Sequence, residues 1–96
     1  MKMNRKLTEA LREAHIDFTT FDIVDIAPQK DGHTVVILAA KKVEHNLPRF
    51  NVQYRDHSLW YYDLRRLMDI CVEEKLYTRL AADRLLYFYN ESLREK

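Results

Sequence analysis

The residues that could bind a metal are four histidines, and their spacing matches no known metal site. The sequence contains no HxH, HExxH or CxxC arrangement, although zinc sites commonly place their ligands at such short intervals. We therefore expect exposed histidines in turns and at element ends, with no metal and no cofactor. Three of them fall in predicted loops or strand ends and could still converge in space: His33, His45 and His57.

The pattern of nucleophiles does not indicate catalysis either. Cys71 falls on the apolar side of a predicted helix, which is typical of a buried thiol and not of a reactive thiolate. Asp56, His57 and Ser58 are direct neighbours, whereas catalytic triads assemble from positions far apart in the chain. A single glycine also excludes a glycine-rich phosphate loop. We therefore predict that the chain has no catalytic residues and is not an enzyme.

Aromatic residues are concentrated in the second half of the chain, where seven lie within 30 positions. They are Trp60, Tyr61, Tyr62, Tyr77, Tyr87, Phe88 and Tyr89. Tyr and Trp are enriched at protein interfaces because they bury a large area and keep a polar tip. At helical spacing two tyrosines group with arginines, which predicts a protein-interaction surface of Tyr62, Arg65, Arg66, Arg84 and Tyr87. The pattern leaves open that these tyrosines simply lie along the surface between helices.

Basic residues around the predicted sheet form a second candidate site, made of Lys41, Lys42, Arg49 and Arg55. A sheet that exposes aromatic and cationic side chains can stack nucleic-acid bases. However, the net charge is only +1, so no overall field attracts a polyanion. Strand alternation also predicts that the aromatic side chains of this region point inward. Nucleic-acid binding is therefore the alternative to protein binding.

The element that must organise these side chains is the apolar run Thr34–Ala40, which can extend towards Val43. Its length and its β-branched residues predict a central strand that is buried on both faces. Alternation places one set of side chains towards the helices. The other set, on the second face, is Val36, Leu38 and Ala40.

Two further strands are predicted beside this one. Residues 18–27 are rich in β-formers, and a bulge near residues 22–24 reconciles their uneven alternation. The Asp31-Gly32 pair predicts the hairpin turn that follows. Residues 49–56 alternate cleanly, which is typical of an edge strand with one wet face.

Helical periodicity appears at both ends of the chain. Residues 4–15 predict an amphipathic helix, and a second helix is expected from about residue 59. The alternative for the second helix is a short strand over residues 59–62, followed by a helix that Asp63 caps. A last helix is predicted from Arg79 to about residue 95, with Phe88 on its apolar side.

These elements predict a two-layer α+β fold in a single domain covering residues 1–96. A three-stranded antiparallel meander carries the helices, in the order α-β-β-β-α-α. Because three short helices can hardly shield both sheet faces, the face of Val36, Leu38 and Ala40 needs a further cover. Either the N-terminal helix covers it or a second copy does so in a homodimer.

The sequence predicts a class of function but no process. A lone cysteine is typical of a reducing compartment, and the first residues contain no apolar signal segment, so we expect a cytoplasmic protein. The leading hypothesis is a small non-catalytic protein-interaction module with a regulatory or inhibitor role. Bacteria and their mobile elements encode many such chains of this size. Its partner would be another protein or itself, without a membrane.

Overall fold

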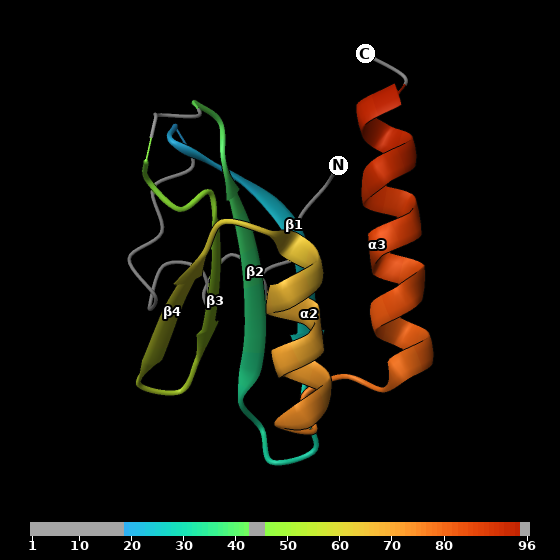
Figure 1. Ribbon diagram of the computed structural model, residues 1–96. Helices are drawn as coiled ribbons and strands as arrows, with labels where there is room; N and C mark the ends of the chain where they lie inside the picture. Colours follow the sequence, from blue (N-terminus) through green and yellow to red (C-terminus); the bar gives the residue numbers. More distant parts are fainter. Residues whose placement is uncertain (1–18, 43–45, 95–96) are drawn as a thin grey trace.

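The computed structural model describes residues 19–42 and 46–94, which form a sheet and two helices (Figure 1). In chain order the elements are β1 (Phe21–Pro28), β2 (Thr34–Ala40), β3 (Phe50–Tyr54), β4 (His57–Tyr61), α2 (Leu64–Glu73) and α3 (Arg79–Arg94). The sheet is antiparallel throughout, and its strands lie in the order β1-β2-β3-β4. This confirms the α+β class, while the helix predicted over residues 4–15 lies outside the described residues.

The prediction of three strands and of a helix from about residue 59 was wrong. Residues 57–61 form strand β4, which pairs with β3. The register partners run from Tyr54 opposite His57 to Phe50 opposite Tyr61. A two-residue turn makes this hairpin possible, because Arg55 adopts the left-handed conformation with φ 54°. β3 is therefore an interior strand and not the predicted edge.

Helix α2 begins only after β4, where Asp63 provides its N-cap. The Asp63 side chain accepts a hydrogen bond from Arg65 N at 3.0 Å, while its own backbone stays extended. The alternative interpretation of this segment, a short strand followed by the Asp63 cap, was thus the correct one. The helix ends where Lys75 takes a left-handed φ of 63° and Leu76 N donates to Cys71 O at 2.8 Å.

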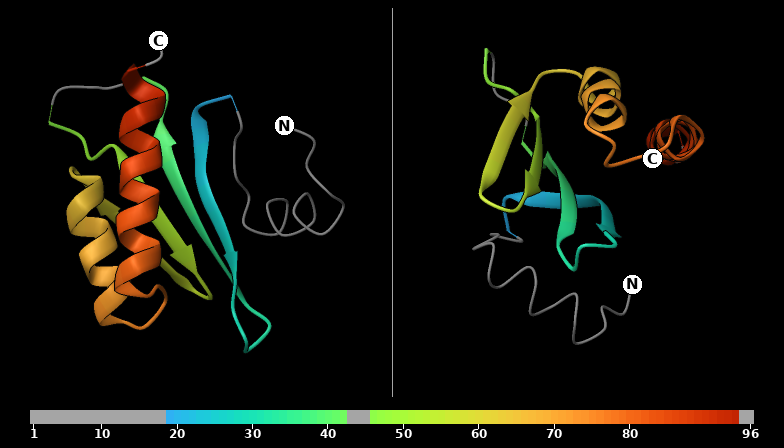
Figure 2. Two further views of the ribbon diagram at one scale, coloured as in Figure 1. Left: turned by 90° about the vertical axis from the view of Figure 1, so that its right-hand side faces the viewer. Right: turned by 90° about the horizontal axis from the view of Figure 1, so that it is seen from below.

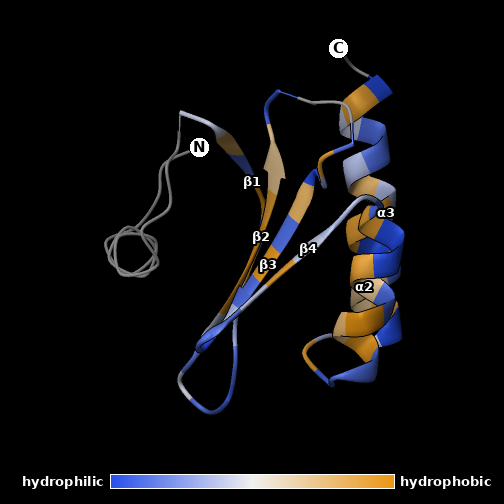
Figure 3. Ribbon diagram, turned by 60° about the vertical axis from the view of Figure 1, so that its left-hand side comes forward, coloured by the Kyte–Doolittle hydropathy of each residue, from blue (hydrophilic) through white to orange (hydrophobic). Residues whose placement is uncertain are grey.

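Strand β2 is the centre of the core, as its apolar run predicts. All residues from Val35 to Ala39 are buried. Val35, Ile37 and Ala39 pack with the inner side of α2, whereas Val36 and Leu38 belong to a separate cluster on the second face. Apolar ribbon segments of the sheet and of α2 accordingly face each other in Figure 3.

A β-bulge in β1 resolves its uneven alternation. The register with β2 shifts between Ile23 and Asp25, so one extra residue lies on the β1 side. As a result Phe21, Ile23 and Ile26 pack with the second-face cluster. Val24, at the bulge, packs with the helix-side core instead.

The two helices share one face of the sheet but contribute unequally to the core. Figure 2 shows α2 and α3 side by side on that face. α2 buries Leu64, Leu67, Met68 and Cys71, whereas Ala82 is the buried residue of α3. Within residues 19–42 and 46–94, neither helix combines the length and apolar character needed to cross a bilayer.

Candidate protein-interaction surface

Helix α3 contacts the rest of the molecule through one side only. The helix starts at a cap in which Ala81 N donates to Thr78 Oγ1 at 3.1 Å. Ala82 is buried, and Leu85, Leu86 and Tyr89 pack on the helix-side core. The ring of Tyr89 meets Phe50 of β3 edge-on at 5.8 Å between centroids. These α3 positions recur at helical spacing and define its buried side.

The opposite side of α3 is also apolar, and it faces solvent. Leu80, Tyr87 and Phe88 expose 67%, 61% and 66% of their surface. Together with two charged residues on the same helix side, they form what we call the outer stripe: Leu80, Arg84, Tyr87, Phe88 and Glu91. The prediction that Phe88 lies on the buried side was therefore wrong. Large apolar side chains gathered on one exposed surface are typical of a binding site.

Two open grooves flank α3. The β1 groove, between α3 and strand β1, encloses about 860 Å³, and its apolar lining includes Val24, Leu80, Leu85 and Phe88. The α2 groove, between α3 and the start of α2, also encloses about 860 Å³ and is lined by Tyr62, Arg65, Asp69 and Arg79 among others. The two grooves differ in chemistry, because the first is mainly apolar and the second is rich in charge.

Ion pairs hold α3 against α2 across the α2 groove. The Arg79 guanidinium lies 2.9 Å from Asp69 of α2 and 3.1 Å from Asp83, one turn further along α3. The hydrogen bond to Asp69 is the main cause that raises the pKa of Arg79. Because all three side chains are exposed, this arrangement contributes little stability and mainly fixes the orientation of α3.

The structure separates the five residues of the predicted interaction surface into two groups. Tyr62 and Arg65 line the α2 groove, and the Tyr62 hydroxyl donates to Asn46 O at 3.2 Å. Arg84 and Tyr87 lie on the outer stripe of α3, and Arg66 is exposed on α2. The outer stripe is the more apolar of the two surfaces.

The four basic residues of the alternative site also fall into two places. Lys41 and Lys42 follow β2 and Arg49 precedes β3, so these three lie at one end of the sheet, where Ala40 N donates to Arg49 O at 2.8 Å. Arg55 lies at the far end of β3, about 20 Å away by the rise of an extended chain. Phe50 is buried, so it offers no stacking surface.

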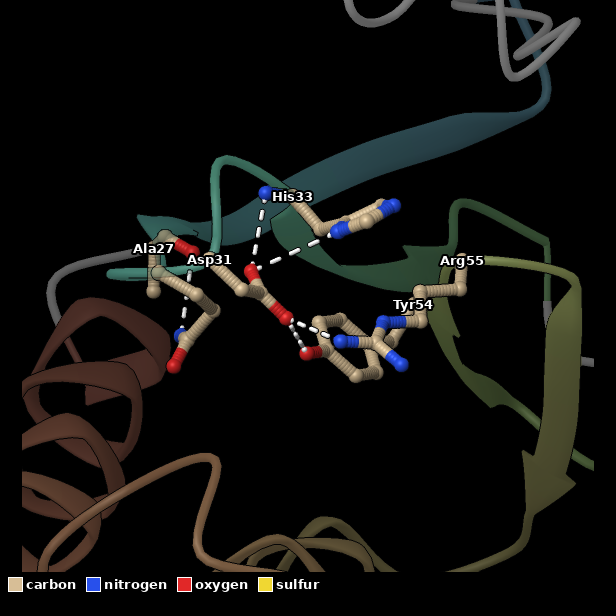
Figure 4. A network of polar contacts seen from close by, with 6 residues as sticks. Ala27, Asp31, His33, Tyr54 and Arg55 are labelled. Carbon is tan, nitrogen blue, oxygen red and sulfur yellow. Dashed lines mark hydrogen bonds and ion pairs between the residues drawn. The ribbon is translucent and has the colours of Figure 1, made fainter.

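Arg55 takes part in a cluster of polar contacts that joins the two hairpin turns (Figure 4). The Asp31 carboxylate accepts hydrogen bonds from the Tyr54 hydroxyl at 2.5 Å, from the Arg55 guanidinium and from His33 N at 2.9 Å. These donors, with Tyr54 first, lower the pKa of Asp31 far below its usual range. We call this cluster the turn tie.

A second polar contact fixes the loop between the helices. The hydroxyl of Tyr77 donates to the Asp25 carboxylate of β1 at 2.6 Å. Burial is the main cause that raises the pKa of Tyr77, and the bond to Asp25 adds to it. Burial likewise raises the pKa of the nearby Cys71 thiol to about 11, which agrees with the expected inert thiol.

Of the three histidines whose sequence positions left open a convergence in space, His45 lies outside the described residues. His33 packs edge-on against Tyr54 at 6.1 Å, and Tyr54 is the register partner of His57. In residues 19–42 and 46–94 no three metal-binding side chains gather.

Arg84 and Tyr87 of the outer stripe belong to the interaction surface predicted from the sequence, whereas Leu80, Phe88 and Glu91 were not included although the signal of a helix seam is present. Residues 80, 84, 87 and 91 follow the 4-3-4 spacing of a helix seam. Two charged residues at these positions concealed the pattern.

Comparison with protein-family models, with curated proteins and with solved structures finds no match for this chain.

Proposed function

We propose that this chain is a small non-catalytic module that acts by binding another protein through the outer stripe of α3, in a regulatory or inhibitor role. The supporting observation is that α3 presents three large apolar side chains, Leu80, Tyr87 and Phe88, to solvent on the part of the helix that does not pack on the core. An exposed stripe of this kind costs solubility in isolation and is typical of helices that lie in a partner's groove or against a partner's helix.

Site-specific photo-crosslinking tests this proposal. A benzoylphenylalanine at Tyr87, in the outer stripe, is compared with one at Glu73, an exposed position on α2. We expect irradiation of cells that make the chain to give discrete protein adducts from position 87 and none from position 73. Equal adducts from both positions, or none from position 87, would contradict the proposal.

Nucleic-acid binding is the second candidate, supported by the cluster of Lys41, Lys42 and Arg49 at one end of the sheet. Fluorescence anisotropy of labelled oligonucleotides at low and moderate salt tests it. Because phosphate contacts release counterions, true binding would weaken steeply as the salt concentration rises. Replacement of Lys41 and Lys42 by Gln should then reduce the binding, while Arg55→Gln should not. An unchanged signal after the lysine replacements rejects this candidate.

A further inference from the structure

We propose that the partner of the outer stripe is a second copy of this chain, whose own α3 packs against it in the antiparallel direction. This inference rests on the proposed function, because it names the partner of the same surface. The four positions Leu80, Arg84, Tyr87 and Glu91 follow one another at intervals of four, three and four residues. That spacing keeps side chains on one seam between two helices that cross at a shallow angle.

The charges of the seam select the antiparallel direction. Arg84 and Glu91 lie seven residues apart, with Tyr87 and Phe88 midway between them. When a twofold axis passes beside the two aromatic residues, Arg84 of each copy lies opposite Glu91 of the other. A parallel pair would instead place Arg84 against Arg84 and Glu91 against Glu91, which repel. The same stripe is therefore complementary to itself in one orientation only.

The aromatic residues provide the centre of this interface. The rings of Tyr87 and Phe88 meet edge-on within one chain, with 5.6 Å between their centroids. Among the described residues, Arg84 has no ion pair within its own chain, and Glu91 has only the 3.6 Å contact with the exposed Arg94. Both charges are therefore available to a second copy.

The area of the stripe indicates a modest affinity. Tyr87 and Phe88 at the centre expose 61% and 66% of their surface, which amounts to roughly 300 Å² for two aromatic residues. A standard interface buries roughly 800 Å² per partner, so the stems of Arg84 and Glu91 and the rim of the β1 groove must contribute the rest. We therefore expect a weak dimer, with a dissociation constant in the micromolar range.

The α3 stripe fits a homodimer better than the sheet face considered from the sequence. Val36 and Leu38 expose only 3% and 2% of their surface, so they offer a second copy little area. The homodimer through the sheet face of Val36, Leu38 and Ala40 stays a prediction. Charge changes confined to α3 distinguish the two dimers, because they alter only the α3 surface.

Sedimentation velocity of the full chain over a range of concentrations tests the inference. We expect the mass to rise from that of an 11.6 kDa monomer towards twice that value. Arg84→Glu and Glu91→Arg should each raise the dissociation constant about tenfold or more, because each turns two attractive pairs into repulsive ones. Lys75→Glu makes the same charge change at an exposed position after α2 and should leave the constant unchanged.

Mixing the two charge variants gives the decisive result. Two chains of the R84E variant repel each other, and so do two chains of the E91R variant, but a mixture of the two variants offers attractive pairs of opposite charge. We expect the equimolar mixture to recover the dimer of the original chain, and circular dichroism should show equal helix content in all samples. A mixture that stays monomeric, or variants that dimerise as well as the original chain, would overturn the inference.

The outcomes also separate this inference from the proposed function. A chain that is monomeric at all concentrations but gives adducts from position 87 with a different protein refutes self-association and supports the binding module. A chain that neither dimerises nor gives adducts refutes both.

Discussion

Helices α2 and α3 lie side by side on the same sheet, yet they use their apolar residues in different ways. The ten residues of α2 bury four side chains in the core, while the sixteen residues of α3 bury one. α3 instead keeps apolar side chains on two opposite sides, one towards α2 and the sheet and one towards solvent. α2 therefore supplies most of the helix side of the core, while α3 leaves a second group of apolar side chains exposed.

The largest effect that tests this comparison comes from a matched pair of leucine truncations. Leu67 of α2 is fully buried, whereas Leu80 of α3 is 67% exposed. We expect Leu67→Ala to lower the free energy of unfolding by about 2–5 kcal/mol. Leu80→Ala should change it by less than about 0.5 kcal/mol. Urea unfolding followed by circular dichroism measures both free energies. The protein concentration is kept below the dissociation constant of any dimer. Similar losses at the two positions would remove the distinction between the helices.

The loop that joins the two helices gives a smaller effect. Tyr77→Phe removes the hydroxyl that donates to Asp25 and leaves a partly buried carboxylate without this donor, which should cost about 1–3 kcal/mol. Tyr87→Phe removes a hydroxyl from the outer stripe and should be neutral. The same urea assay compares the two variants, and an equal response would show that the Tyr77 contact does not fix the loop.

Removal of the N-cap side chain from each helix should change the free energy of unfolding by less than the preceding substitutions. Asp63→Ala and Thr78→Ala each remove a side chain that accepts a backbone hydrogen bond at the first turn, at a cost of about 1 kcal/mol or less. Because α2 supports the core, we expect Asp63→Ala to lower the midpoint of global unfolding. Thr78→Ala should mainly speed amide hydrogen exchange at the start of α3. Identical exchange in that variant would indicate that α3 is as firmly held as α2.

The smallest effect depends on pH and concerns the turn tie, far from both helices. Since the folded pKa of Asp31 lies below the ordinary value of 3.8, its contribution to stability is present above about pH 4 and is lost as the pH falls through the folded pKa. Asp31→Asn should therefore be less stable than the original chain at pH 6, and the difference should shrink as the pH falls below about 4. Asp56→Asn on the next turn is the matched control. A gap between the chains that stays constant with pH would contradict the assigned pKa.

The parts of the fold that the sequence predicted correctly are those fixed by local patterns. The apolar run at β2, the interruption of β1 near Asp22–Val24 and the start of α3 at Arg79 each show their physical cause within a few residues. Strand β4 was only the alternative interpretation of its segment, because Trp60 and Tyr61 also fit the apolar side of a helix. Only the turn at Arg55 and the pairing with β3 decide between the two.

The candidate site was predicted less well, because it depends on what a side chain faces after folding. The pattern indicated correctly that Tyr62, Arg84 and Tyr87 are exposed. It could not show that α2 covers only one side of α3, which is what leaves Phe88 in solvent. The turn tie joins residues more than 20 positions apart, and no local rule connects Asp31 with Tyr54.

The order of the strands in the sheet has a consequence for folding. Because β1, β2, β3 and β4 are neighbours in the same order along the chain, each strand can pair with the one made just before it. Such short-range pairing gives a low contact order and favours fast folding.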